Sequence, residues 1–134
     1  MNILSEIRAR FRPALESLQV DDTATYLEMI KPSQDPQFGD YQANCAMPLA
    51  NQLGESPRKI ADRLIAKIDV ADLCQNVEVA GPGFINLTLC DQWLSDQLDA
   101  ALHDERLGIP AVDLPRTYII DYSAPNVAKP MHVG

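Results

Sequence analysis

NVEVAGPGFINLTL, residues 76–89, decides the fold class of this chain of 134 residues. Apolar and polar residues alternate over 76–80 and again over 84–89, and Gly-Pro-Gly separates the two runs. Alternation with a period of two is typical of strands that bury one face. A glycine-containing connection between two such runs predicts a β-hairpin.

The second strand of this hairpin presents two different faces. One face carries apolar side chains, which we expect in the core: Ile85, Leu87 and Leu89. The other face carries an aromatic ring, an amide and a hydroxyl, which we expect to meet solvent: Phe84, Asn86 and Thr88. A ring and an amide side by side on an open sheet surface suit the recognition of an unstacked nucleobase. Ordinary sheet packing of Phe84 is the alternative.

The segments before the hairpin favour two helices and a strand. Residues 2–18 carry apolar side chains at helical spacing, and Pro13 predicts a kink or a break in that helix. Residues 24–30 favour a strand. Residues 41–53 favour a second helix, with Asp40 as its N-cap and Gly54 at its end.

Two further helices complete the pattern. Ser56-Pro57 is a strong helix start, because serine caps the first turn and proline suits its first position. The last helix is predicted over residues 92–103, with Asp91 as N-cap and His103 as C-cap. We therefore expect an α+β fold with a small, mostly antiparallel sheet and about three helices packed on one face.

Composition narrows the classes of function. The net charge of −8 argues against a domain that binds nucleic acid through bulk electrostatics, so any RNA contact must be local. No apolar run is long enough to span a membrane. Cys45, Cys74 and Cys90 show no metal-ligand spacing and fit reduced thiols, so we expect a cytoplasmic protein without a metal site.

Two basic groups are candidates for phosphate contacts. The first lies on the helix over 2–18 and comprises Arg8, Arg10 and Arg12. The second lies on the helix after Pro57, with only Asp62 to relieve it, and comprises Arg58, Lys59, Arg63 and Lys67. A solvated helix face is the alternative for both.

The C-terminal stretch combines a strand with a polar loop. Residues 116–120, Arg-Thr-Tyr-Ile-Ile, favour a buried strand. Serine, asparagine and two prolines over 121–134 then favour a loop, and His132-Val133-Gly134 resembles the first turn of a helix. A strand, a polar loop and a helix N-terminus together form an anion site, beside which Lys129 and His132 would lie.

The run SAPNVAKPMHVG, residues 123–134, resembles the class I signature of the arginyl-tRNA synthetase family, which continues with a further histidine. Three other stretches resemble the family's N-terminal additional domain: FGDYQANCAMPLA at 38–50, SPR at 56–58 and AGPGFINL at 80–87. We therefore expect a piece of a longer enzyme, cut at the start of its catalytic domain. The expected division is residues 1–106 for the additional domain, 107–115 for a linker and 116–134 for the start of the catalytic domain.

The resemblance implies roles for residues in the tail. Lys129 and His132 match catalytic positions around the ATP phosphates, with Gly134 also at the nucleotide. Asp121, Ser123 and Asn126 match positions that hold arginine. The implied cofactors are ATP and the Mg²⁺ that accompanies it. The family commonly has serine where this chain has Ala124, so one substrate contact is in doubt.

For the additional domain, the resemblance implies contact with the D-loop and elbow of the tRNA. Gly81, Phe84 and Asn86 match the tRNA-binding positions. The implied reaction is the ATP-dependent ligation of arginine to its tRNA through arginyl-adenylate. We expect a monomer, and we expect this fragment alone to be inactive. The alternatives are a stand-alone RNA-binding module and a protein-interaction module without catalysis.

Overall fold

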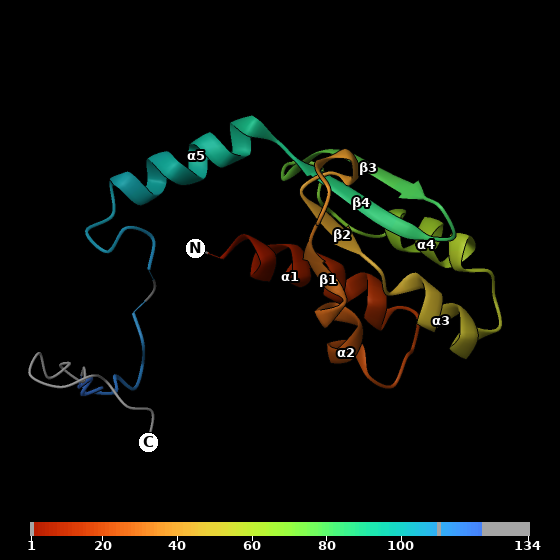
Figure 1. The fold of residues 1–134 in the computed structure, drawn as a ribbon, viewed down its shortest axis with the longest axis horizontal. Helices are drawn as coiled ribbons and strands as arrows, with labels where there is room; N and C mark the ends of the chain where they lie inside the picture. The colour runs from red at the N-terminus through yellow and green to blue at the C-terminus, as the bar shows by residue number, and fades with distance from the viewer. Residues whose placement is uncertain (1, 110, 122–134) are drawn as a thin grey trace, which may run out of the picture.

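A computed structural model describes residues 2–109 and 111–121. It confirms the α+β fold: a four-stranded antiparallel sheet in the order β1-β2-β4-β3, with helices against one face (Figure 1). The elements in chain order are α1 (Ile3–Glu16), α2 (Thr23–Glu28), β1 (Ile30–Pro32), η1 (Pro36–Phe38), β2 (Tyr41–Ala43), α3 (Ala46–Leu53), α4 (Pro57–Ile65), β3 (Cys74–Ala80), β4 (Phe84–Leu89) and α5 (Asp91–Leu102).

The core lies between the sheet and the helices α1 to α4. Ile30, Ala43 and Ile85 face one another across three strands and are fully buried, as is Leu87. The helices supply the other half of the core, including Phe11, Ile7, Leu15, Leu49, Ile60 and Leu64. The apolar face predicted for 84–89 is therefore confirmed.

The hairpin of β3 and β4 is also confirmed, and its turn depends on glycine. Gly83 has a φ of 145° and lies against the start of α4. A Cβ atom there would come within 2.9 Å of the backbone carbonyl of Pro57. The turn thus fixes the hairpin against the helical layer as well as joining its strands.

Residues 24–30 are not one strand, which corrects the sequence prediction. Thr23–Glu28 forms α2, and Ile30 is the one residue of the predicted strand that belongs to a strand, as the first residue of β1. The Asp22 carboxylate accepts hydrogen bonds from the Thr25 backbone N–H (3.2 Å) and hydroxyl (2.5 Å). This N-cap satisfies a free donor of the first turn, and it overrides the modest strand preference of the segment.

The helix predicted over 41–53 divides into β2 and α3, and Asp40 is not its N-cap. Asp40 instead joins the start of β2 to β4, the other inner strand of the sheet. Its backbone N–H donates to the Leu87 carbonyl (2.8 Å), and its carboxylate accepts from the Leu89 N–H (2.8 Å). The predicted end of the helix is confirmed, because Gly54 is left-handed with a φ of 66°.

The first and last helices also differ from expectation. α1 continues through Pro13 to Glu16, so the predicted break is absent. α5 begins at Asp91, which makes Cys90 the N-cap residue, and His103 is the C-cap as predicted. α5 extends away from the body (Figure 1). The side chains of its Leu98 and Leu102 are more than 60% exposed.

Residues 116–120 do not form the predicted buried strand. They have no regular structure, and Ile119 is 94% exposed. A strand needs neighbours for its backbone N–H and C=O groups, and no strand within residues 2–109 or 111–121 pairs with this segment. No helix in the part of the chain that the structure describes is both long and apolar enough to cross a membrane.

Candidate nucleic-acid interface

A row of polar side chains crosses the sheet on the face turned away from the helices. Strand pairing aligns Lys31 of β1 with Gln42 of β2, Gln42 with Asn86 of β4, and Asn86 with Glu78 of β3. These residues alternate with the buried apolar positions of the same strands, so their side chains lie on the opposite face. We call this surface the polar face.

Hydrogen bonds join three members of the row. The Gln42 Nε2 donates to Asn86 Oδ1 at 2.8 Å, and Asn86 Nδ2 donates to Glu78 Oε1 at 3.3 Å. Asn86 is consequently only 3% exposed, although it lies outside the apolar core. The expectation that Asn86 meets solvent freely is therefore wrong, because its two cross-strand neighbours cover it.

Phe84 lies two residues before Asn86, at the start of β4 and beside the turn. Its side chain is half-buried. Gly81 is exposed in the turn with a φ of 51°, and a Cβ there would lie 3.6 Å from Phe84 Cδ2. The structure thus places the three residues of the expected tRNA site, Gly81, Phe84 and Asn86, close together along β4 and the turn before it.

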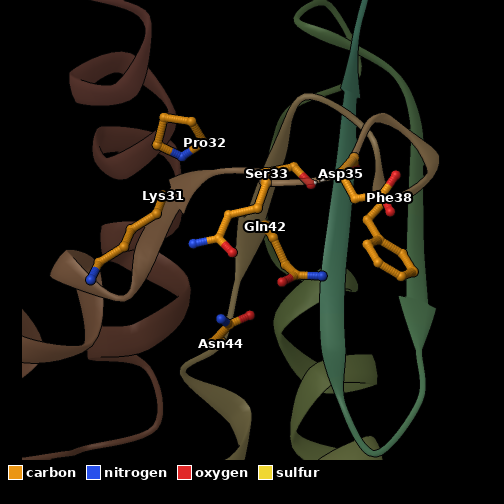
Figure 2. A pocket seen from close by; sticks show the side chains of 8 residues that line it. Lys31, Pro32, Ser33, Asp35, Phe38, Gln42 and Asn44 are labelled. Carbon is orange, nitrogen blue, oxygen red and sulfur yellow. Dashed lines mark hydrogen bonds between the residues drawn. The ribbon is translucent and has the colours of Figure 1, made fainter.

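A pocket of about 360 Å³ opens beside this row. Figure 2 shows its lining in front of the strands, with helices behind them. The Gln42 amide turns its nitrogen toward β4 and its oxygen toward the side where Asn44 lies (Figure 2). The lining residues are Lys31, Pro32, Ser33, Gln34, Asp35, Phe38, Gln42 and Asn44.

The pocket holds polar groups without partners. Asn44 Oδ1 is buried and accepts no hydrogen bond from any residue in 2–109 or 111–121. Lys31 forms no ion pair within those residues. The Asp35 carboxylate, in contrast, already accepts hydrogen bonds from the Gln37 backbone (3.0 Å) and side chain (2.7 Å).

Sequence reasoning missed Lys31 and Asn44 as site residues. Lys31 comes directly after the strand predicted over 24–30, and Asn44 falls within the helix predicted over 41–53. The signal was the spacing of Gln42 and Asn44, which places both side chains on one face once residues 41–43 are a strand.

The first basic group is largely used within the fold. Arg10 forms a double hydrogen bond with the Asp72 carboxylate, both at 3.0 Å, and pairs with Glu6. Arg8 donates to the Ile30 carbonyl at 3.0 Å. Among the three arginines, Arg12 is the one that is exposed without such a contact in the described part of the chain.

The sequence predicts that Asp62 alone offsets the positive charge of the second basic group, but the structure shows a further acidic partner. Glu55 accepts from Arg63 at 2.6 Å and pairs with Lys59 at 3.0 Å. Lys67 donates to the Ser17 hydroxyl at 2.8 Å. This helix is thus a weaker candidate for phosphate contact than the sequence indicates.

Of the residues expected to bind arginine and ATP, one lies among the described residues. Asp121 is described and is exposed. The remaining predicted positions lie outside the described residues: Ser123, Asn126, Lys129, His132 and Gly134. Within residues 2–109 and 111–121, no three histidine, cysteine or acidic side chains are grouped as metal ligands would be.

Two family models match the chain. The model of the arginyl-tRNA synthetase N-terminal domain matches residues 5–89. The model of the catalytic domain of class I tRNA synthetases of the arginine type matches residues 97–134. The first match covers the sheet and the helices α1 to α4.

Curated relatives agree with these matches. An arginine–tRNA ligase of Rhodopirellula baltica is 49% identical over all 134 residues, which are 20% of that protein's length. An arginine–tRNA ligase of a Synechococcus species is 47% identical over 131 residues, 98% of this chain and 22% of that protein. The chain therefore spans about a fifth of the length of these relatives.

Two solved structures share the fold. Arginyl-tRNA synthetase from Plasmodium falciparum superimposes with a TM-score of 0.65 at 20% identity, over 77% of this chain and 19% of that one. The Thermus thermophilus arginyl-tRNA synthetase superimposes with a TM-score of 0.52 at 22% identity, over 85% of this chain and 17% of that chain. From the matched models and relatives, the chain belongs to the arginyl-tRNA synthetase family, of which it carries the N-terminal domain and the beginning of the catalytic domain.

Proposed function

We propose that the polar face binds the D-loop at the elbow of a tRNA, in a longer protein that ligates arginine to that tRNA. The observation that supports this most is the position of Phe84. Its half-buried ring stands at the edge of the polar face, next to an amide row and an exposed glycine turn. Base stacking on an aromatic ring contributes about 1–3 kcal/mol per base and requires an accessible ring face.

Asn86 would act from beneath the base. Each amide side chain has two N–H donors and two acceptor lone pairs. Gln42 and Glu78 engage one acceptor site and one donor of Asn86 and leave its side chain 3% exposed, so a base edge would reach the remaining donor and acceptor when Gln42 or Glu78 turns aside. The same two partners fix the orientation of the amide, so its donor and acceptor are presented in a defined order.

Affinity has to come from local contacts because the whole chain is acidic. A net charge of −8 repels phosphate at long range. Stacking on Phe84 and hydrogen bonds to Asn86 are short-range and tolerate that field. Most of the electrostatic attraction would then come from the remainder of the longer protein.

For the longer protein we propose the activity named for its relatives, arginine–tRNA ligation. ATP, with its Mg²⁺, would activate the arginine carboxylate when bound. In this chain Lys129, His132 and Gly134 would lie at the phosphates, and Asp121, Ser123 and Asn126 at the arginine. The division at residues 106 and 116, the cytoplasmic location and the monomeric state remain predictions.

Kinetics of the full-length protein test the assignment of the face. Phe84→Ala should raise the KM for tRNA in arginine charging by about 5- to 160-fold, since one stacked base worth about 1–3 kcal/mol is lost, with kcat little changed. Phe84→Tyr keeps the ring and should restore the parent KM. An unchanged KM in Phe84→Ala would reject the polar face as the tRNA contact.

A further inference from the structure

We infer that the pocket beside the polar face holds a second nucleotide of the same RNA loop, with its phosphate against Lys31 and a hydrogen-bond donor on Asn44 Oδ1. This inference rests on the proposed function, and it adds a subsite to it. The pocket volume of about 360 Å³ is of the size that small ligands occupy. Gln42 lines the pocket and is bonded to Asn86, so the two subsites are adjacent.

Asn44 gives the strongest reason to expect a ligand. Its Oδ1 is buried without a hydrogen-bond partner among the described residues. Such a group costs about 1–3 kcal/mol, and native proteins retain few of them without a reason. Solvent does not reach Oδ1 in the free protein, so a base N–H or a ribose hydroxyl in the pocket would satisfy this oxygen once the Asn44 amide turns toward it.

Lys31 supplies charge at the same place. It is exposed on the outermost strand β1 and has no ion-pair partner within residues 2–109 and 111–121. The acid in the lining, Asp35, keeps its charge but accepts hydrogen bonds from Gln37 and forms no ion pair with Lys31. A phosphate would therefore meet an available ammonium group in a chain that is otherwise acidic.

The remaining lining groups also suit a nucleotide. The Gln42 oxygen faces the pocket while its nitrogen is bonded to Asn86 (Figure 2). It adds a second acceptor for base donors. Phe38 is 41% exposed at the rim and offers a ring for stacking. The Phe38 ring would stack on the base, and Lys31 would meet the phosphate. The side-chain oxygens of Gln42 and Asn44 would accept from the donors of the base.

Equilibrium binding of the full-length protein to a transcript of its arginine tRNA tests the inference. Lys31→Gln should weaken binding severalfold and lower the slope of log K against log salt by about one, as for one lost phosphate contact. Arg12→Gln is the matched control, because it removes the same charge from an exposed site on α1, in the helical layer on the opposite side of the sheet from the polar face. It should change both quantities far less.

Asn44→Leu separates binding from structure. It removes an unpartnered buried acceptor with little change in size, so the Tm should stay the same or rise while tRNA affinity falls. If this variant lowers the Tm, Asn44→Asp replaces it; the carboxylate keeps the shape and should weaken binding by repelling the phosphate.

The inference is overturned if Lys31→Gln behaves like Arg12→Gln, or if the Asn44 variant binds as the parent does. Phe84→Ala, measured in parallel, separates a failure of the second subsite from a failure of the proposed function. If Phe84→Ala weakens binding while the pocket variants do not, the polar face binds RNA without a second subsite. If Phe84→Ala also binds as the parent does, the proposed function itself fails.

Discussion

The side chains of Gln42 and Asn86 are joined by a 2.8 Å hydrogen bond between the neighbouring strands β2 and β4. Asn86→Ala would leave Gln42 and Glu78 without this partner, and we expect a loss of about 1–2 kcal/mol in the free energy of unfolding. Urea denaturation measures it. In a double-mutant cycle with Gln42→Ala, the coupling should be about 1 kcal/mol.

An exposed amide on the same sheet provides the control for that cycle. Asn76 lies on β3 and makes no side-chain hydrogen bond within the described residues. Asn76→Ala should change stability by less than about 0.5 kcal/mol. A coupling near zero between Gln42 and Asn86 would show that the amide row does not hold the polar face together.

Gly83 and Gly54 both have positive φ, and we expect very different effects of alanine at the two sites. At Gly83 a Cβ would meet the Pro57 carbonyl group at 2.9 Å, so the backbone must shift. At Gly54 there is nothing within 4 Å. Gly83→Ala should cost about 3 kcal/mol or more, and Gly54→Ala about 1 kcal/mol. Equal midpoints of thermal unfolding would contradict the close contact between the turn and α4.

The pair of Arg10 and Asp72 ties α1 to the segment before β3, and its effect should depend on pH. Hydrogen bonding by Arg10 holds the pKa of the Asp72 carboxyl below its ordinary value of 3.8. The stabilisation is therefore fully present above pH 3.8 and is lost as the pH falls through the lower pKa of the folded state.

Arg10→Gln tests this pair. At pH 7 it should cost roughly 1 kcal/mol, since the geometry is bidentate but half-exposed. The difference between variant and parent should shrink below pH 3.8. Arg12→Gln, on the same helix, should have little effect at either pH. A cost that does not change with pH would mean that Arg10 acts through packing and its hydrogen bond to the Asp69 carbonyl (3.0 Å), not through Asp72.

The three cysteines should differ in their rate of alkylation. Burial raises the pKa of the Cys45 and Cys74 thiols to about 11, so about one in a thousand is a thiolate at pH 8. Cys90 is more exposed. Mass spectrometry after brief iodoacetamide treatment should find Cys90 modified first, with all three reacting alike in urea. Early modification of Cys45 would contradict the packing of the core around it.

The elements with strong local signals could be predicted from the sequence. The β3–β4 hairpin and the start of α4 follow from alternation, Gly-Pro-Gly and Ser56-Pro57, and the structure confirms them. Residues 24–30 and 41–44 could not be read in this way. Their structure is set by the Asp22 cap and by the bonds of Asp40 to β4, which no local pattern reveals.

The site was predicted in part for a similar reason. The position of Phe84 and Asn86 on the face away from the helices follows from strand periodicity alone. The burial of Asn86 depends on which residues lie beside it, and these come from β2 and β3 through register. The side chains of Leu98 and Leu102 on α5, and the apolar side chains of residues 116–120, follow patterns that predict burial. They are exposed here because no other described element packs against them.

Photo-crosslinking from position 84 tests the central claim most directly. A photoreactive phenylalanine analogue replaces Phe84 in the full-length protein, a second variant carries it at the control position Arg12, and the crosslinked tRNA nucleotide is mapped by primer extension. We expect a crosslink to the D-loop from position 84 and none from position 12. A crosslink from position 84 to another region of the tRNA, or equal crosslinking from both positions, would contradict the account.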